Sequence, residues 1–332
     1  MNDNLKLQGK RILTTLMAAA CVFGCEPKNQ EFDTAAAPSL NTPVQVQAIP
    51  IPSDSSLEDT LTVLASTIGE RNLARYEKLE QTRDYISRRM EKAGYSLELN
   101  SFKGKLVDKE VHNLIFTKPG NEEILVVGAH YDSAPGTPGA NDNGSGVAVL
   151  LHLAEQLKDT KTKKTIRFVF FVNEEPPYFM SSDMGSRVYA KLCAQQEDKI
   201  VGMLSLETMG YYSDEPGSQH FPPGINGYPD TGSFLAFVTE PKSQSFLQEC
   251  LENFHGFPHE SLVAPGGLEG VSWSDHASFW AYNYPAIMVT DTAPFRYPHY
   301  HRDSDTPDKI NIEKLNLVAE SLQDMLSKLA SK

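Results

Sequence analysis

The chain of 332 residues contains little cysteine and no excess of positive charge. It has four cysteines, and its formal net charge is -13 at neutral pH. A chain this acidic is a poor partner for nucleic acid or for an anionic membrane surface. It has no helix-turn-helix pattern and no basic-aromatic pattern that would reverse this expectation. The sequence therefore predicts no nucleic-acid partner.

Several common catalytic signatures are also missing. No His-Glu-x-x-His run marks a zinc-binding helix, and no Gly-x-Ser-x-Gly turn marks a serine nucleophile. A glycine-rich loop at residues 136–146 lacks the lysine of a phosphate-binding loop and the glycine spacing of a dinucleotide site. Neither Cys193 nor Cys250 has Cys-x-x-Cys spacing or follows a predicted strand beside a histidine, which argues against thiol chemistry, and their pairing cannot be asserted.

The N-terminal part of the chain differs from the rest. A basic start precedes an apolar stretch, residues 12–24, which is too short to span a membrane and has the form of an export signal. The following Cys25 resembles the lipidated cysteine of bacterial lipoproteins; Cys21 is a second candidate, and a plain signal peptide is the alternative. Residues 25–56 are polar and rich in proline, without apolar periodicity, which predicts a flexible tether.

Three segments follow from this pattern. We predict a lipoprotein signal peptide at 1–24, a tether at 25–56 and one catalytic domain at 57–332. The protein is then expected to be exported and anchored to the bacterial cell envelope, with the N-terminal lipid as its only attachment to the membrane.

From residue 57 onward, helical and strand patterns alternate. The expected helices cover 57–68, 79–93, 144–157, 186–193, 243–254, 276–282 and 312–329. The expected strands cover 95–102, 112–117, 124–128, 165–173, 200–206, 234–239 and 286–290. This alternation predicts a single α/β domain whose central sheet is mixed but mostly parallel, with helices on both faces.

The most hydrophobic run of the chain, residues 165–173, ends on Glu174 and Glu175. The run is continuous, β-branched and aromatic, which is typical of a buried parallel strand. Two glutamates at such an end are most often a solvated acidic turn. Alternatively, because neighbouring side chains at a strand end point in different directions, one carboxylate can bind a metal while the other acts as a base.

Other polar side chains are expected at the same edge of the sheet, because sites in such sheets form at the carboxyl ends of strands. They are His130, Asp132, Asp142, Glu207 and His301. Imidazole nitrogen and carboxylate oxygen suit zinc, including two ions that share one carboxylate. Asp132 lies two residues after His130, on the same strand face, and could fix its tautomer. A single histidine at a strand end is more often structural, so only the whole set supports a metal site.

The order and spacing of these segments resemble a zinc-dependent exopeptidase family. This family includes bacterial leucine-type aminopeptidases, glutamate carboxypeptidases and animal-type glutaminyl cyclases, and the resemblance spans residues 57–330. The motifs that carry it are Gly128-Ala-His-Tyr-Asp-Ser133, Gly139-Ala-Asn-Asp-Asn-Gly-Ser-Gly146, Asn173-Glu-Glu175, Ser274-Asp-His276 and His301-x-x-x-Asp305-Thr.

The resemblance implies a pair of zinc ions bridged by Asp142. His130 and Glu207 would complete one site, and Glu175 and His301 would complete the other. The substrate would be a peptide with a free N-terminus, cut by an aminopeptidase.

The same resemblance assigns roles to further residues. Glu174 would be the general base that activates the water, and Asp132 would support His130. The segment 274–276 would line the pocket, or Ser274 or Asp275 would cap a helix.

The chain departs from the family in two places. Glu207 stands where the family usually has aspartate, which keeps an oxygen ligand but lengthens it by one methylene. The connection 176–184 is longer than usual, and two prolines stiffen it, so it forms either a pocket wall or a surface turn.

Two other functions compete with the aminopeptidase. A glutaminyl cyclase would use one zinc ion for an intramolecular attack, but the loop 139–146 resembles that of the two-metal peptidases. A non-catalytic peptide-binding lipoprotein would be expected to have lost a ligand or the base, whereas every position except that of Glu207 carries the family's residue.

Overall fold

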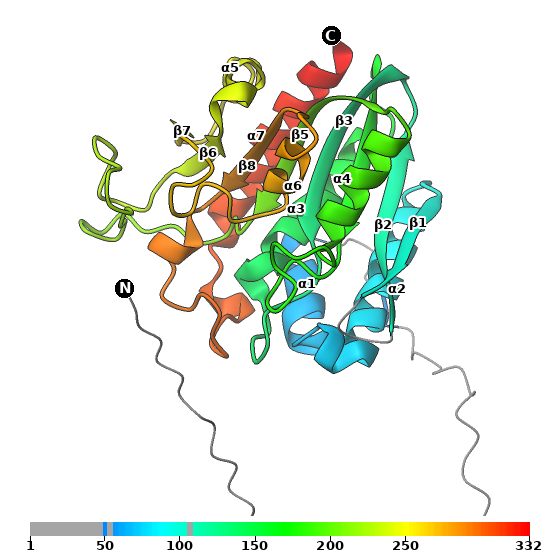
Figure 1. Cartoon of the computed structure of the whole chain (residues 1–332). Coiled ribbons are helices and arrows are strands. Elements are labelled where there is room, and N and C mark those ends of the chain that lie inside the picture. The colour runs from blue at the N-terminus through cyan, green and yellow to red at the C-terminus, as the bar shows by residue number, and fades with distance from the viewer. Residues whose placement is uncertain (1–48, 52–55, 105–108) are drawn as a thin grey trace, which may run out of the picture. The chain divides into compact units, whose positions relative to one another are not determined.

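An eight-stranded mixed sheet forms the centre of the computed structural model, which describes residues 49–51, 56–104 and 109–332 (Figure 1). The strands are β1 (Leu97–Lys103), β2 (Glu110–Lys118), β3 (Asn121–His130), β4 (Lys164–Phe171), β5 (Lys199–Glu207), β6 (Leu235–Thr239), β7 (His259–Val263) and β8 (Ala286–Thr290). Their order is β1-β2-β4-β3-β5-β8-β6-β7. The central strands β4, β3, β5 and β8 run parallel, as do β6 and β7, while β1, β2 and the β6–β8 pair are antiparallel. The predicted fold class is confirmed.

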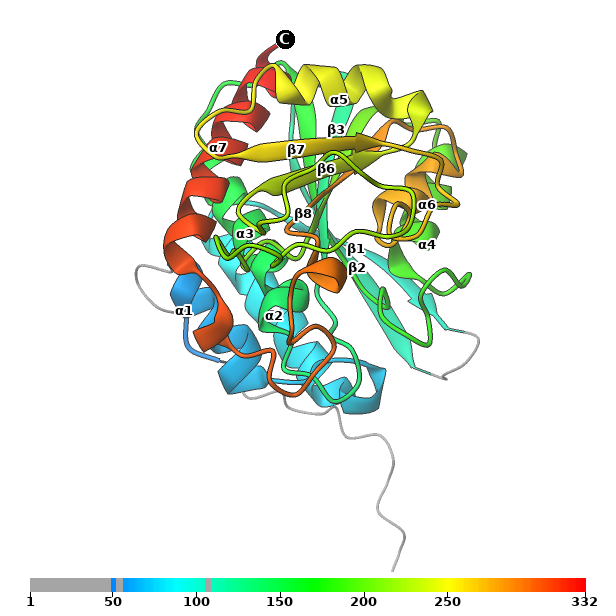
Figure 2. The ribbon, with the colours of Figure 1, turned by 90° about the vertical axis from the view of Figure 1, so that its left-hand side faces the viewer.

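Helices cover both faces of the sheet, as predicted. They are α1 (Leu57–Leu61), α2 (Tyr76–Lys92), α3 (Gly146–Leu157), α4 (Gly185–Gln195), α5 (Gln244–Leu251), α6 (His276–Trp280) and α7 (Ile312–Ser331). Figure 2 shows α1, α2, α3 and α7 on one side of the sheet and α4 and α6 on the other. Among the described residues, no helix combines the length and the apolar character needed to cross a bilayer.

The start of the first helix follows directly from its sequence. Ser56 and Asp59 form a reciprocal cap: the Asp59 N–H donates to the Ser56 side chain at 3.0 Å, and the Asp59 carboxylate accepts from the Ser56 N–H at 3.3 Å. The helix continues as a wider turn over Thr62–Ile68 and ends at Gly69, whose φ of 79° suits glycine.

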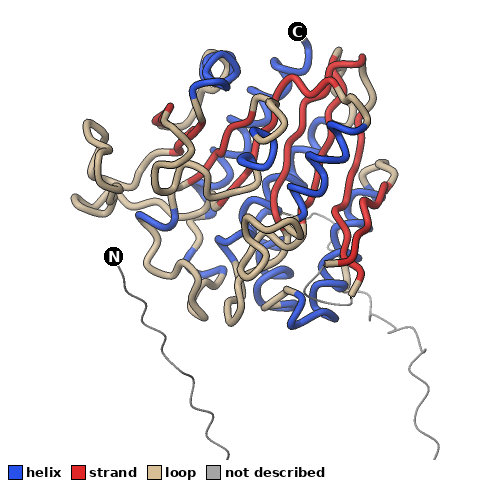
Figure 3. The backbone as a smooth tube through the Cα atoms, viewed as in Figure 1, coloured by secondary structure: helices blue, strands red, loops and turns tan. Residues whose placement is uncertain are grey.

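The sequence did not predict strand β7. It lies at the edge of the sheet, pairs only with β6 among the described strands, and is half-exposed along most of its length. Because neither side of the strand is fully buried, its sequence lacks the alternation that would reveal it. Figure 3 shows that the strands near this edge are joined by long loops rather than by helices alone.

Most of the predicted N-terminal features lie outside the described residues. These include the signal peptide 1–24, both candidate cysteines and nearly all of the tether 25–56. Within the described part, Ile49 and Ile51 pack against the hydrophobic core, and the Ile49 carbonyl accepts a hydrogen bond from Arg88 at 2.7 Å.

The two cysteines of the folded domain are free thiols. Cys193 and Cys250 are both buried and do not pair with each other. Burial raises the pKa of the Cys193 thiol to about 12, so it stays protonated at neutral pH.

Candidate metal centre

The parallel strands bring the predicted site residues together at one edge of the sheet. His130 ends β3 and Glu207 ends β5. Glu174 and Glu175 follow β4 after a turn at Asn173, whose φ of 58° redirects the chain. The two remaining ligand candidates come from loops: Asp142 precedes α3, and His301 precedes α7.

Asp142 lies between two groups of possible metal ligands. His130 Nε2 is 3.4 Å from Asp142 Oδ1 and 3.4 Å from Glu207 Oε2. On the other side, His301 Nε2 is 3.0 Å from Asp142 Oδ2 and 3.2 Å from Glu175 Oε2. Each oxygen of one carboxylate therefore faces a different histidine.

These distances fit metal ligands. Nitrogen and oxygen ligands about 2.0–2.1 Å from a tetrahedral zinc ion lie about 3.3 Å from one another, close to the separations of 3.0–3.4 Å in the two groups. Two buried ligand atoms, His130 Nε2 and Glu175 Oε1, also have no hydrogen-bond partner within the described part of the chain. Unpartnered buried polar atoms are costly and need a reason, and a bound cation would provide one.

Glu174 lies beside both groups without belonging to either. Its Oε2 atom is 3.8 Å from His130 Nε2, and its side chain is buried. It can also form a third group of possible ligands with His130 and Glu175. Burial raises the pKa of Glu174 well above its usual range, against the opposing effect of His130.

The ligand candidates around Asp142 titrate far from their usual ranges. Burial alone would lower the pKa of His301, but the carboxylates of Asp142 and Glu175 raise it to about 10. Burial and the Asp142 carboxylate together raise the pKa of Glu175 to about 8. Without a metal, the pair formed by Glu175 and His301 therefore binds protons more tightly than the isolated side chains would.

Asp132 has closer partners than the histidine that it was predicted to support. Its carboxylate accepts hydrogen bonds from the backbone N–H groups of Glu174 and Glu175, at 3.2 and 3.1 Å. Its Oδ1 atom is 3.6 Å from His130 Nδ1, and that nitrogen also lies 3.2 Å from the Asp132 carbonyl oxygen. Asp132 thus links the end of β3 to the turn that follows β4.

The loop that carries Asp142 is held by a residue from the far end of the chain. The Asp305 carboxylate accepts hydrogen bonds from the N–H groups of Asn141 and Asp142, at 2.8 and 3.1 Å. Tyr297 donates its hydroxyl to the same carboxylate at 2.7 Å. The motif that contains His301 therefore also fixes the backbone at Asp142.

Two further residues brace the same loop, and their roles were not predicted. Arg71 is fully buried and donates to the carbonyl oxygens of Tyr131 and Gly139, both at 2.8 Å. Asn143 donates to the Leu206 carbonyl at 2.8 Å, next to Glu207. Arg71 lies in a short connection with no motif around it, so no local signal marks it.

Ser274 contacts Glu207 rather than capping a helix. Its hydroxyl donates to Glu207 Oε2 at 2.7 Å. Asp275 precedes α6 but makes no side-chain cap hydrogen bond, so the predicted capping role is wrong for both residues. The serine thus fixes the side chain of Glu207.

Removing this hydroxyl is expected to weaken one metal site. Partners that orient a metal ligand typically contribute about 10- to 100-fold in metal affinity, so Ser274→Ala should lower the affinity for one of two zinc ions by that factor. Calorimetric zinc titration measures it. The matched control is Ser278→Ala, which removes a buried hydroxyl that pairs with Ser186 instead; equal effects of both substitutions would contradict the assignment.

An open cavity gives access to this centre. It is lined by Asp142, Glu174, Glu175, Pro176, Phe179, Glu207, Trp273, Tyr300 and His301, and its empty volume is about 590 Å³, including open solvent. Phe179 thus lines this cavity, whereas Met180, in the same loop, is exposed. The connection 176–184 forms both a pocket wall and a surface turn.

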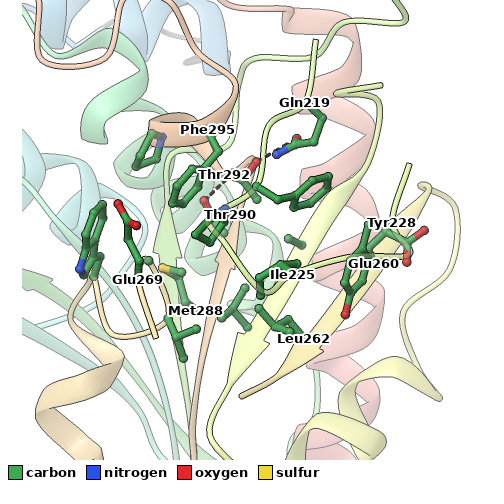
Figure 4. Close-up of a pocket in the computed structure, with 18 of the residues that line it drawn as sticks. Gln219, Ile225, Tyr228, Glu260, Leu262, Glu269, Met288, Thr290, Thr292 and Phe295 are labelled. Carbon is green, nitrogen blue, oxygen red and sulfur yellow. Dashed lines mark hydrogen bonds between the residues drawn. The ribbon is translucent and has the colours of Figure 1, made fainter. Parts of the chain in front are cut away.

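Figure 4 shows a second, apolar pocket, which shares lining residues with the first. Both are lined by Glu207, Trp273 and Tyr300. The apolar pocket has an empty volume of about 760 Å³, including open solvent. Its walls come from β6, β7, β8 and three loops, and include Phe221, Ile225, Tyr228, Phe234, Ala236, Val238, Leu262, Met288 and Phe295.

The fold and the site define an α/β protein with a candidate two-metal centre at the carboxyl edge of its parallel strands. Residues 113–326 match the family described as Peptidase family M28. The chain belongs to peptidase family M28, a family of metallopeptidases.

Two relatives illustrate the range of sequence similarity. The chain is 34% identical over 288 residues to the Escherichia coli (strain K12) protein named "Uncharacterized protein YfbL", covering 82% of this chain and 88% of that protein. It is 29% identical over 256 residues to Leucine aminopeptidase 1 of Arthroderma otae, covering 71% of this chain. The match spans only 62% of that aminopeptidase.

Solved structures with the same fold have more than one activity in their names. A zinc aminopeptidase from Bacillus subtilis, BSAP, superposes with a TM-score of 0.66 at 18% identity, over 84% of this chain and 95% of that one. Fimbriiglobus ruber glutaminyl cyclase superposes with a TM-score of 0.62 at 21% identity, over 86% and 99%. At such identities the likeness shows the fold alone.

Proposed function

We propose that the protein is a zinc-dependent aminopeptidase that releases the N-terminal residue of peptides. The observation that carries the proposal is the position of Asp142, whose two oxygens face two histidine-carboxylate groups, with Glu174 beside both. A shared carboxylate next to a free carboxylate is the arrangement expected of a two-metal hydrolase.

His130, Asp142 and Glu207 would hold one zinc ion, and Glu175 and His301 would hold a second one together with Asp142. Bound zinc supplies Lewis-acid polarisation of a carbonyl and lowers the pKa of a water molecule.

Glu174 would move the proton. Among the described residues, no side chain is hydrogen-bonded to it in a way that would hold it in another role, and burial raises its pKa. Such a carboxylate can take a proton from water near neutral pH and pass it to the leaving amine. The two roles first expected of the Glu174-Glu175 pair are thus divided between one base and one ligand.

The surroundings of the centre favour a substrate with a free N-terminus. An α-amine is largely protonated near neutral pH, and the site presents several buried carboxylates. The apolar pocket beside Glu207, with its floor of Ala236, Val238 and Met288, would receive the side chain of the N-terminal residue.

Glutaminyl cyclisation is the competing reaction, and the fold is compatible with both. Hydrolysis is favoured because both groups of ligand candidates are filled, including the group with Glu207. A cyclase that uses one zinc ion would not need the second group.

One assay separates these functions. Peptides that begin with leucine or glutamine, each with a free or an acetylated N-terminus, are incubated with the zinc-loaded protein, and the products are identified by mass spectrometry. We expect free amino acid from the unblocked peptides only. Cyclised glutamine without hydrolysis, or equal cleavage of acetylated peptides, would contradict the proposal.

Metal binding should release protons and weaken in acid. Because the pKa values of Glu175 and His301 are raised to about 8 and about 10 without metal, this pair holds at least one proton at pH 7 that must be lost when zinc binds. The apparent zinc affinity should fall at least about tenfold for each pH unit below neutrality. Calorimetric zinc titration in buffers of different ionisation enthalpy measures the number of protons released on binding. Binding heats that do not depend on the buffer would contradict this prediction.

The location of the protein remains a proposal from the sequence alone. The segment before Cys25 supports export and lipid attachment to the cell envelope, with Cys21 as the second candidate. Mass spectrometry of the mature N-terminus tests this: a lipid-modified Cys25 or Cys21 is expected, and an unmodified N-terminus at another residue would contradict the anchor.

A further inference from the structure

A third cavity meets the cavity over the centre at Glu175. It is lined by Asn72, Leu73, Ala74, Asp132, Pro135, Asn173, Glu175, Pro176, Pro177 and Tyr178. Its empty volume is about 650 Å³, including open solvent. It shares Glu175 and Pro176 with the cavity over the centre, whereas the apolar pocket shares Glu207, Trp273 and Tyr300 with it. We call it the Tyr178 cavity.

The two side cavities therefore meet the centre at different carboxylates, one at Glu207 and one at Glu175, which belong to the two different groups of ligand candidates that share Asp142. A peptide bond placed beside Glu174 has one residue on each side. If the apolar pocket holds the N-terminal residue, the next residue reaches the Tyr178 cavity. We propose that this cavity binds the side chain of the second residue of the substrate, and that this side chain is apolar; the inference rests on the proposed function.

The exposed rim of the Tyr178 cavity would let the rest of a bound peptide extend into solvent. Ala74, Pro135, Pro176 and Pro177 are all exposed, so a chain that continues beyond the second residue can run into solvent. By contrast, the floor of the apolar pocket consists of buried strand residues. The active site of an aminopeptidase must accept a single residue on one side of the scissile bond and remain open to the rest of the peptide on the other side.

Two polar side chains in the walls of the Tyr178 cavity, Asp132 and Asn72, already have partners, whereas the Oε1 atom of Glu175, a metal-ligand candidate, has none among the described residues. The Asp132 carboxylate accepts from the backbone of Glu174 and Glu175. The Asn72 amide donates to the Ser133 carbonyl at 3.1 Å, and its oxygen accepts from the Ala74 N–H at 3.1 Å. The remaining wall is apolar, so hydrophobic contact is the main interaction that the cavity offers.

Both walls are held in place before any ligand binds. Asn72 caps the short helical turn Leu73–Arg75 on one side. On the other side, the Tyr178 N–H donates to the Glu175 carbonyl at 3.0 Å, and Tyr178 itself is buried in the main core. A cavity with walls fixed in this way is typical of a binding subsite.

The test compares substrates that differ only after the scissile bond. The zinc-loaded protein is assayed with leucinamide, Leu-Gly-Gly, Leu-Leu-Gly, Leu-Phe-Gly and Leu-Asp-Gly. Because an apolar group in a fitting pocket changes kcat/KM by about tenfold or more, Leu-Leu-Gly and Leu-Phe-Gly should exceed Leu-Gly-Gly by that factor, and Leu-Asp-Gly should not.

Two substitutions at the exposed rim, Ala74→Tyr and Pro135→Tyr, should obstruct the cavity from opposite sides without removing a core residue. Each should abolish the preference for leucine and phenylalanine, while kcat/KM for leucinamide stays within about twofold, because leucinamide has no second residue. The control is Ala281→Tyr, at an exposed alanine outside this lining, which should preserve the preference.

The outcomes separate the two proposals. Cleavage of all the peptides with equal kcat/KM, or a preference that survives both rim substitutions, overturns the subsite and leaves the proposed function intact. Failure to hydrolyse leucinamide and every peptide overturns the proposed function, and the subsite with it.

Discussion

Glu174→Gln is expected to lower kcat about 100- to 10,000-fold, which is the contribution that a positioned general base commonly makes. Glutamine has nearly the same size and shape but cannot accept and hold the proton. Because Glu174 belongs to neither of the two groups that share Asp142, the protein should keep its zinc content and its fold. Steady-state rates with a leucine peptide, together with metal analysis of the same sample, test both statements.

The zinc content of the Glu174→Gln variant distinguishes two explanations for a loss of activity. Glu174 can also join His130 and Glu175 in a third group of ligand candidates. Loss of zinc from Glu174→Gln would therefore make Glu174 a ligand instead of a base. Retained turnover with normal zinc content would remove it from the mechanism.

Asp142→Asn is expected to disturb both metal sites, because this one carboxylate belongs to both groups of ligand candidates. The amide keeps one oxygen but loses the charge, and its nitrogen cannot coordinate either ion. Loss of several kcal/mol of metal assistance corresponds to a drop of about 1,000-fold or more in kcat/KM. Zinc binding should weaken at both sites rather than at one.

A surface aspartate provides the matched control. Asp214 is exposed and pairs only with Lys314 among the described residues, so Asp214→Asn should change neither zinc content nor activity. If Asp142→Asn kept one zinc ion at normal affinity, the carboxylate would not be shared, and the two-metal account would be wrong.

The sequence predicted the parts of the site that depend on local pattern. The continuous apolar run before Glu174 marks a buried parallel strand, and His130 and Glu207 follow similar runs. Since parallel strands share a carboxyl edge, their terminal residues had to lie close together once the sheet was correctly predicted. In the structure, His130 Nε2 lies 3.4 Å from Glu207 Oε2.

The supporting residues were harder to predict because their partners lie far away in the chain. Asp305 holds the backbone at Asn141, 164 residues earlier, and no periodic pattern encodes such a contact. Arg71 braces the same loop from a connection that contains no motif. Strand β7 was not predicted because it is a half-exposed edge strand. The part of the apolar pocket that β7 lines was therefore not predicted either.

Glu207 remains the residue on which the number of metal ions depends. Its extra methylene is compatible with a place beside His130 and Asp142. Glu207 Oε2 lies 3.4 Å from His130 Nε2 and accepts a hydrogen bond from Ser274. The substitution of glutamate for the family's aspartate thus does not remove an oxygen from the centre.

A zinc titration of the metal-free protein tests the central claim most directly. Wild-type protein is stripped with a chelator, zinc is added back in steps, and the release of leucine from Leu-Leu-Gly is measured at each step. We expect no activity without metal and a rise that ends at about two equivalents per chain. Full activity in the stripped protein, or a rise that ends at one equivalent, would contradict the account.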